Sequence, residues 1–296
     1  MVVITGANGN IGRKVAETLL AEGAEVRVVS RDTKRLQLLA EKGADVWGGS
    51  LQDEAFLTEA FRGAAAVFVM IPPNHGSENL RVYQNRIGEV IFTALKNTEV
   101  NHIINLSALG AHRPDKTGPI LGLYDQEQRL NWLKDVNLVH LRPTLFMENL
   151  LNNISQMKNQ GIHGTALKGD LAIPVIATKD VARVACNYLR ELDFCGIVVR
   201  ELLGQRDVSM IEMTAILAKA IGVDKLDYVQ FSSEKAKHAM IEAGFSIDVT
   251  ASLLELYESM NTGDVIVGTP RTEQNTTETS FEEFAGVFAR RYHNTN

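Results

Sequence analysis

Short apolar runs alternate with longer segments of helical periodicity through the first half of the chain. The runs at 2–4 and 65–71 are continuously apolar, as expected of strands covered on both faces of a parallel sheet. Strands that alternate with crossover helices predict an α/β fold with a Rossmann-type, doubly wound parallel sheet. The predicted strands are 2–4, 26–29, 44–47, 65–71, 102–106 and 138–141, and the predicted helices between them are 11–22, 32–39, 53–61, 77–96 and 124–134.

The rhythm changes after Pro143. The segment 149–170 is rich in Asn, Gly and other polar residues and is expected to be irregular, and beyond it helical patterns predominate, the clearest at 209–221. The other elements predicted here are helices at 178–190, 233–243, 249–260 and 281–292, a strand at 197–199 and a loop at 263–279. We therefore expect a Rossmann domain at 1–148. Residues 149–296 would form a smaller, mainly helical lobe, from which one strand or segment returns to the sheet.

Three glycines, Gly6, Gly9 and Gly12, lie between the first predicted strand and the first predicted helix. A dinucleotide pyrophosphate binds backbone N–H groups at a helix N-terminus, where the helix dipole favours negative charge. Gly6 permits the tight turn, Gly9 lets the phosphates approach, and Gly12 lets the helix pack on the sheet. This GxxGxxG spacing at the start of a βαβ unit predicts dinucleotide binding rather than a merely structural turn. The loop residues expected at the cofactor are Gly6, Asn8, Gly9, Asn10, Ile11 and Gly12.

The end of the second predicted strand distinguishes NAD from NADP. NAD-binding proteins usually carry an acidic residue there, about 20 residues beyond the loop, for the ribose hydroxyls. Here the strand ends at Ser30 and is followed by Arg31, which is able to pair with a 2′-phosphate and stack on adenine. Lys34 and Arg35 add positive charge one turn later. Asp32 could instead bind the ribose, but we interpret it as the N-cap of the next helix, so NADP(H) is expected in preference to NAD(H).

The composition favours small molecules over macromolecular partners. The chain of 296 residues is 45% hydrophobic, enough for a large core, and carries a net charge of −6. No run of Lys or Arg supplies a basic surface for nucleic acid, and an acidic chain gains little from an anionic membrane. No stretch approaches the ~18 apolar residues of a membrane helix, and no signal peptide precedes the first strand. We expect a cytoplasmic monomer or homodimer without a metal site, because the cysteines and histidines lack metal-binding spacing.

Several runs resemble the NmrA-like group of atypical short-chain dehydrogenases/reductases. The opening 5–12, Thr-Gly-Ala-Asn-Gly-Asn-Ile-Gly, is similar to the start of that family. The run 141–149, Leu-Arg-Pro-Thr-Leu-Phe-Met-Glu-Asn, resembles its Arg-Pro…Phe-Met-Glu-Asn signature. The runs 178–182 and 281–285 resemble its Asp-Val-Ala helix start and its C-terminal helix. The resemblance covers nearly the whole chain, and the family includes quinone, azo-dye and triphenylmethane reductases as well as redox-sensing regulators that bind the cofactor and do no chemistry.

The resemblance implies that NADP(H) lies along the carboxyl ends of the strands. Residues that follow the third, fourth and fifth predicted strands would then line the cofactor, those after the third near adenine. A plain strand terminator is the alternative role for Pro72, and a turn hydroxyl is the alternative for Ser107. The residues expected to line the cofactor are Ser50, Leu51, Met70, Ile71, Pro72 and Ser107.

The chain departs from the short-chain dehydrogenase pattern at the catalytic pair. Those enzymes commonly place a Lys four residues after a Tyr, where it lowers the pKa of the Tyr and holds the nicotinamide ribose. Here Tyr124 is followed at that spacing by Gln128, and Gln126 stands where many NmrA-like members have a Lys. Gln126 can hydrogen-bond the ribose but carries no charge, which weakens the expected proton relay through Tyr124. Tyr124 is either the proton donor or a partly buried aromatic residue before a helix.

Residues near the expected nicotinamide end are candidates for substrate binding. Phe146 and Met147 would form walls of a cleft between the sheet and the second lobe. His112 lies in the loop after the fifth predicted strand, where a solvated loop residue is the alternative. Asn149 either ties the crossover between the lobes or contacts the substrate or cofactor.

Two functions remain open on these grounds. The first is an oxidoreductase that transfers hydride from NADPH to a small quinone-like or dye-like acceptor, which needs mainly proximity to the nicotinamide, since water can protonate the product. The second is a non-catalytic NADP(H)-sensing regulatory protein, which the missing Lys favours. Fold analogy alone cannot name the acceptor.

Overall fold

A seven-stranded parallel sheet forms the centre of the molecule. The computed structural model describes residues 1–266 and 269–295. The strand order is β10-β6-β5-β4-β1-β2-β3, with every neighbouring pair parallel, so the predicted Rossmann-type α/β fold is confirmed. The strands are β1 (Val2–Thr5), β2 (Val26–Ser30), β3 (Asp45–Gly48), β4 (Ala66–Met70), β5 (His102–Leu106), β6 (Asn137–Pro143) and β10 (Ile197–Leu202).

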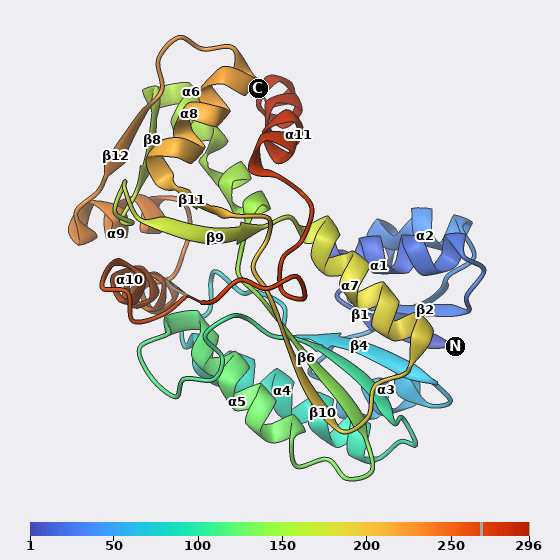
Figure 1. Ribbon diagram of the computed structural model, residues 1–296. Helices are drawn as coiled ribbons and strands as arrows, with labels where there is room; N and C mark the ends of the chain where they lie inside the picture. The colour runs from blue at the N-terminus through green and yellow to red at the C-terminus, as the bar shows by residue number, and fades with distance from the viewer. Residues whose placement is uncertain (267–268, 296) are drawn as a thin grey trace.

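Helices cover both faces of this sheet (Figure 1). The helices α1 (Asn10–Ala21), α2 (Gln37–Glu41) and α7 (Thr178–Glu191) lie on one face, and α3 (Glu54–Phe61), α4 (Leu80–Lys96) and α5 (Leu121–Leu130) lie on the other. Successive residues of one strand point to opposite faces. Ile4 therefore packs in the core under α1 and α7, and Val3 in the core under α3 and α4. The central strands β1 and β4 are buried on both faces and are almost entirely apolar.

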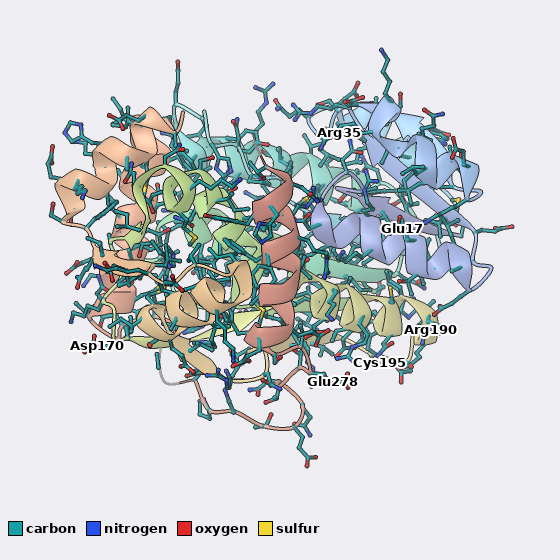
Figure 2. All side chains as sticks on the ribbon, turned by 90° about the horizontal axis from the view of Figure 1, so that it is seen from above. Glu17, Arg35, Asp170, Arg190, Cys195 and Glu278 are labelled. Atoms are coloured by element: carbon teal, nitrogen blue, oxygen red, sulfur yellow. The ribbon has the colours of Figure 1, made fainter. Side chains whose placement is uncertain are left out.

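Residues from beyond the sixth strand return to the sheet. β10 pairs in parallel with β6, from Ile197 opposite Leu138 to Leu202 opposite Pro143. α7 packs beside α1, and Figure 2 shows Arg190 on α7 near this helix pair; its guanidinium lies 2.8 Å from Glu22 at the end of α1. The strand-like run at 197–199 is thus a seventh strand of the main sheet.

A second lobe contains helices and small sheets. The helices are α6 (Ile154–Gln160), α8 (Met210–Ile221), α9 (Ser233–Glu242), α10 (Ile247–Asn261) and α11 (Phe281–Asn294). The strands β11 (Asp207–Ser209), β9 (Ala172–Ile176) and β7 (Leu145–Phe146) form one small sheet, and β12 (Asp227–Gln230) and β8 (Ile162–Thr165) form another.

The sequence-based prediction of an irregular segment at 149–170 is wrong. This segment contains the end of the 3₁₀ helix η3 (Met147–Asn153), all of α6, and β8. Gly161 ends α6 in the left-handed conformation with φ of 65°, and β8 then runs beside β12. β8 has the sequence Ile-His-Gly-Thr, so it shows no alternation of apolar and polar residues, and the ring of Phe231 packs directly on its Gly164.

Contacts between the lobes hold the segment that links β4 to α4. The backbone N–H of Leu80, the first residue of α4, donates to Asp248 Oδ2 at 2.7 Å. The N–H of Ser246 donates to the carbonyl of His75 at 2.8 Å, and its hydroxyl donates to the carbonyl of Ser77 at 2.5 Å. The turn between α9 and α10 therefore fixes a loop at the carboxyl edge of the main sheet. Among the helices of the described residues, none has the length and apolarity to cross a membrane.

Candidate cofactor and active site

The glycine loop joins β1 to α1 at the carboxyl edge of the sheet. Gly6 has a φ of 67°, in the left-handed region, and a Cβ on Gly12 would lie 2.5 Å from the carbonyl oxygen of Gly6. Gly9 is the N-cap of α1 and has no side chain to cap it, so within the described residues no N-cap side chain accepts from the first N–H groups of the helix. Uncapped N–H groups and the helix dipole form a site for an anion such as a pyrophosphate.

Asn8 ties this loop to the end of β2. Its Nδ2 donates to the carbonyl of Asp32 at 3.1 Å and also contacts Ser30 Oγ. Its Oδ1 is buried, and no other group in the described part of the chain donates to it. A buried amide oxygen without a donor is costly, so this atom fits a ligand hydroxyl or amino group. Together with the glycine cradle, it shows that the loop fits a dinucleotide.

The segment after β2 is positively charged. Arg31 is exposed, and it lies close enough to Tyr83 of α4 for its charge to oppose the rise in the pKa of Tyr83 that burial causes. Arg13 of α1 donates to the carbonyl of Arg35 at 2.8 Å, and Figure 2 shows Arg35 beside the N-terminal part of the molecule, drawn in blue. Arg13 was not predicted as part of the site. Its position directly after Gly12 is the signal that could have identified it.

Asp32 does not act as the expected cap. It occupies the N-cap position of the 3₁₀ helix η1 (Thr33–Leu36), but its side chain makes no capping hydrogen bond. The segment begins as a 3₁₀ turn rather than an α-helix, and the carbonyl of Asp32 instead accepts from Asn8. The carboxylate of Asp32 is exposed.

The predicted residues after β3 and β4 lie at the same edge of the sheet as the glycine loop. The side chain of Met70, the last residue of β4, packs on Gly6, with its Sδ 2.8 Å from where a Cβ would stand. Ile71 is buried and Pro72 is half-buried. Ser50 and Leu51 are half-buried and follow β3, which lies two strands from β1 in the sheet. Because β4 adjoins β1, the loops after these strands converge at the switch point where ligands bind in such sheets.

Ser107, directly after β5, belongs to a buried polar network that the sequence did not reveal. Its Oγ lies 2.5 Å from Glu127 Oε1 of α5. Glu127 also forms a two-bond ion pair with Arg142 of β6, with Arg142 Nε at 2.9 Å from Oε1. Both carboxylate oxygens are thus occupied, and Glu127 is only 1% exposed. The Arg-Pro run at 142–143 was the one sequence signal for this network.

Gln126 and Tyr124 lie on different sides of α5. The Oε1 of Gln126 packs on Gly88 of α4, only 2.3 Å from where a Cβ would stand, and its Nε2 is buried without a partner among the described residues. Gln126 therefore lies in the α4–α5 contact rather than in the loops of the cofactor edge. Tyr124 is half-buried near Arg81, whose guanidinium is paired with Asp125 at 2.8 Å. The positive charge of Arg81 beside Tyr124 is therefore paired with the carboxylate of Asp125.

The predicted substrate residues have diverse positions. Met147 is 1% exposed and belongs to the core of the second lobe, so its side chain does not line a cleft. Phe146 is half-buried and packs against the core beneath α1 and α7. Asn149 and His112 are both exposed. The structure does not bring these four side chains together.

The Glu of the Phe-Met-Glu-Asn run has a structural role. Both carboxylate oxygens of Glu148 accept from the backbone N–H of Thr178 at 3.0 Å, and the hydroxyl of Thr178 donates to Oε1 at 2.5 Å. Glu148 thus caps α7, which has no cap from its own N-cap residue, Ala177. The motif holds the crossover between the lobes.

No cluster of three or more His, Cys, Asp or Glu side chains in residues 1–266 and 269–295 is arranged to hold a metal ion. A hollow of about 680 Å³ lies at the ends of α4 and α5, lined by residues such as Phe92 and Trp132. It lies at the edge of the sheet where β5 and β6 begin, opposite to the glycine loop, and so is separate from the candidate site.

Three curated relatives align with most of the chain. A (4-alkanoyl-5-oxo-2,5-dihydrofuran-3-yl)methyl phosphate reductase of Streptomyces griseus is 27% identical, covering 89% of this chain and 88% of the relative. An NAD(P)H azoreductase of Xenophilus azovorans is 26% identical and covers 98% of both chains. Quinone oxidoreductase 2 of Escherichia coli is 28% identical, over 92% of this chain and 95% of the relative.

Solved structures share the fold at lower identity. The triphenylmethane reductase of Citrobacter sp. complexed with NADP(H) superposes with a TM-score of 0.82 at 18% identity, covering 98% of this chain and 100% of the other. The negative transcriptional regulator NmrA in complex with NADP gives a TM-score of 0.70 at 14% identity, over 97% and 90%. The model of the NmrA-like family matches residues 1–285. With the glycine loop, the parallel sheet and this match over nearly its whole length, the chain belongs to the NmrA-like family.

Proposed function

We propose that this protein is an NADPH-dependent reductase that transfers hydride to a small quinone-like or dye-like acceptor. The observation that carries the proposal is the cradle formed by Gly6, Gly9 and Gly12 at the uncapped N-terminus of α1. It fits a pyrophosphate, and the strand-end residues beside it would then run toward the nicotinamide. Curated relatives named as azo-dye and quinone reductases support the same class of reaction.

The residues of the chain would bind and orient rather than provide covalent chemistry. The cofactor, when bound, supplies the hydride. Its nicotinamide half would be held by Met70, Ile71 and Ser107. Its other half would contact the buried amide oxygen of Asn8. Reduction of a planar acceptor needs mainly proximity and orientation, and solvent or the Tyr124 hydroxyl would provide the proton.

Turnover is tested by following the loss of NADPH absorbance with a panel of quinones, azo dyes and triphenylmethane dyes. A butenolide phosphate of the kind in the name of the Streptomyces griseus relative completes the panel. NADPH binding is measured in parallel by its fluorescence. Turnover with at least one acceptor is expected, and failure to bind NADPH would refute the proposal altogether.

We infer a preference for NADPH over NADH from the charge after β2. Arg31 is exposed beside the end of this strand, and Lys34 and Arg35 follow it. A bidentate Arg–phosphate pair is worth roughly 1.5–3 kcal/mol, so Arg31→Ala should weaken NADPH by about tenfold or more and leave NADH nearly unchanged. Arg290→Ala, an exposed change on α11, is the matched control. Equal losses for both cofactors would contradict this role of Arg31.

A non-catalytic NADP(H) sensor is the second candidate function. It is favoured because Gln, rather than Lys, stands at both 126 and 128, so α5 offers no Lys to lower the pKa of Tyr124. Gln126 itself is packed against α4. The likeness in fold to NmrA is consistent with it. Tight NADPH binding without turnover across the panel would support the sensor. If turnover is found, Tyr124→Phe decides whether the phenol takes part, since an unchanged rate would remove it from the mechanism.

A further inference from the structure

The network below the end of β5 contains one carboxylate, one guanidinium and one hydroxyl, all largely buried. Ser107 is 4% exposed and Glu127 is 1% exposed. The guanidinium of Arg142 reaches both oxygens of Glu127, and this pairing raises the pKa of Arg142 against the effect of its burial. The two N–H···O contacts between the guanidinium and the carboxylate make this a charge-assisted ion pair.

The chemistry of these groups fixes the direction of the Ser107 hydrogen bond. An ionised carboxylate only accepts and a guanidinium only donates. Since Arg142 donates to Glu127, the remaining contact of Glu127 Oε1, at 2.5 Å from Ser107 Oγ, must be a bond in which the serine hydroxyl donates. The proton of Ser107 is thus committed to Glu127, and its oxygen keeps lone pairs that can only accept.

Ser107 lies at the edge of the sheet where the nicotinamide half of a cofactor would bind. Ser107 directly follows β5 at the carboxyl edge, and its backbone N–H is held by the carbonyl of Leu141 at 2.7 Å. β5 adjoins β4, which adjoins the strand that carries the glycine loop. A dinucleotide with its pyrophosphate at that loop would direct its nicotinamide half toward this edge.

We propose that Glu127 is a positioning residue that makes Ser107 a dedicated acceptor for a donor on the nicotinamide half of the cofactor, either the carboxamide N–H or a ribose hydroxyl. This inference rests on the proposed function. It assigns Ser107 to orientation of the cofactor and excludes it as the proton donor to the acceptor molecule. Arg142 stabilises the charge that sets this orientation.

The test compares two ligands that differ by the nicotinamide. NADP⁺ contains it, whereas 2′-phospho-ADP-ribose lacks it and keeps the pyrophosphate and the adenosine 2′-phosphate. Calorimetric binding is measured for the unmodified protein, Ser107→Ala, Glu127→Gln and the double variant. A hydrogen bond of roughly 1–1.5 kcal/mol predicts that Ser107→Ala weakens NADP⁺ about five- to tenfold and leaves the fragment unchanged. Glu127→Gln should give a similar loss, because its amide is able to donate to Ser107 Oγ and occupy the lone pair.

The double variant separates positioning from general structure. If Glu127 acts through Ser107, Glu127→Gln should cause no further loss of NADP⁺ affinity in the Ser107→Ala background. Losses that add, or a loss for both ligands alike in Glu127→Gln, would overturn the proposal. So would equal NADP⁺ binding by Ser107→Ala and the unmodified protein. If the unmodified protein binds neither ligand, the proposed function has failed instead.

Loss of the Glu127 charge leaves Arg142 buried without a partner, which threatens folding. The combined variant Glu127→Met/Arg142→Leu removes both charges and replaces them with apolar side chains of similar volume. It is expected to fold and to bind NADP⁺ more weakly relative to the fragment, because the Ser107 hydroxyl keeps its lone pairs but is no longer held as an acceptor. If this folded variant binds NADP⁺ as tightly as the unmodified protein does, Glu127 has no positioning role.

Discussion

Backbone geometry decides which residues are possible in the glycine loop. Gly12 lies within the first turn of α1, and a Cβ there would stand 2.5 Å from the carbonyl oxygen of Gly6 and 2.8 Å from its carbonyl carbon. No flexible side chain is available to move aside, so the loop itself would have to shift. The N–H groups that would face a bound pyrophosphate would shift with it.

Gly12→Ala should therefore lower both stability and cofactor affinity. Overpacking of this kind costs roughly 1–3 kcal/mol, and NADPH affinity should fall by about tenfold or more. Gly286→Ala in α11 is the control, because a Cβ there meets nothing within 4 Å. This substitution also replaces a glycine inside a helix with a better helix former. It should stabilise the protein by roughly 0.5–1 kcal/mol. Urea unfolding and NADPH fluorescence measure both effects, and a Gly12→Ala protein as stable as Gly286→Ala would contradict the argument.

Site residues were predictable where the backbone geometry requires glycine. They were not predictable on α5, where the rotation of the helix about its axis determines which side chains face inward. Gly6, Gly9 and Gly12 are distinguished by spacing alone. On α5 the buried positions include Gln126 and Glu127, which are polar, so hydrophobic periodicity could not show which face of the helix lies inside. One residue along a helix turns the side chain by about 100°, so Gln126 faces Gly88 of α4 while Glu127 reaches Ser107. The cofactor role of Gln126 stays a prediction.

At the scale of elements, the crossover between the lobes depends on a cap that comes from another segment. α7 starts at Thr178 after Ala177, which cannot cap it, and Glu148 accepts its first N–H with both carboxylate oxygens. The negative charge also lies favourably at the N-terminus of the helix dipole. Because α7 packs beside α1, this cap stabilises the helix pair that covers one face of the sheet.

Glu148→Ala should destabilise the protein by roughly 2–3 kcal/mol, since it removes a charged group that forms several hydrogen bonds. Glu148→Gln keeps one oxygen as acceptor but loses the charge and the second acceptor oxygen, so a smaller loss than in the Ala variant is expected. Thermal or urea unfolding of the three proteins gives the comparison. The assignment of a capping role would be wrong if the Gln variant were no more stable than the Ala variant.

The central strands β1 and β4 were predictable because they are buried on both faces and are almost entirely apolar. The short strands of the second lobe give a weaker pattern. β7 has two residues and β11 has three, too few to establish any periodicity, and they are held by pairing with β9 rather than by their own sequence. That lobe was accordingly expected to be more helical and less regular than it is.

At the scale of the whole molecule, the lobes are joined through their loops and the C-terminal segment. Asp180 of α7 accepts from the backbone N–H of Thr279 at 3.0 Å and from its hydroxyl at 2.8 Å. The N–H of Leu203, just after β10, donates to the carbonyl of Asn275 at 2.7 Å. With Asp248 at the start of α4, these contacts make unfolding of one lobe disturb the other.

Each lobe also contains a buried histidine that is neutral in the folded state. His140 on β6 contacts Asn105 Nδ2 through Nδ1 and Asn131 Oδ1 through Nε2, so one ring nitrogen accepts and the other donates. His163 on β8 contacts Thr214 Oγ1 through Nδ1, and Nε2 is buried without a partner in the described part of the protein. A second proton on either ring would therefore have no hydrogen-bond acceptor among the described residues. Burial lowers the pKa of each to about 4, from 6.5.

Acid should therefore destabilise both lobes in the same pH range. Between pH 6.5 and 4 the unfolded chain binds a proton at each histidine that the folded protein does not, so stability falls as the pH falls. Each histidine contributes about 1.4 kcal/mol per pH unit in this range. Urea unfolding at several pH values should show this slope, and His163→Leu should reduce it by about the share of one histidine. His112→Asn, which removes an exposed histidine, is the control. A His163→Leu protein that keeps the full slope would show that His163 accepts its proton without unfolding.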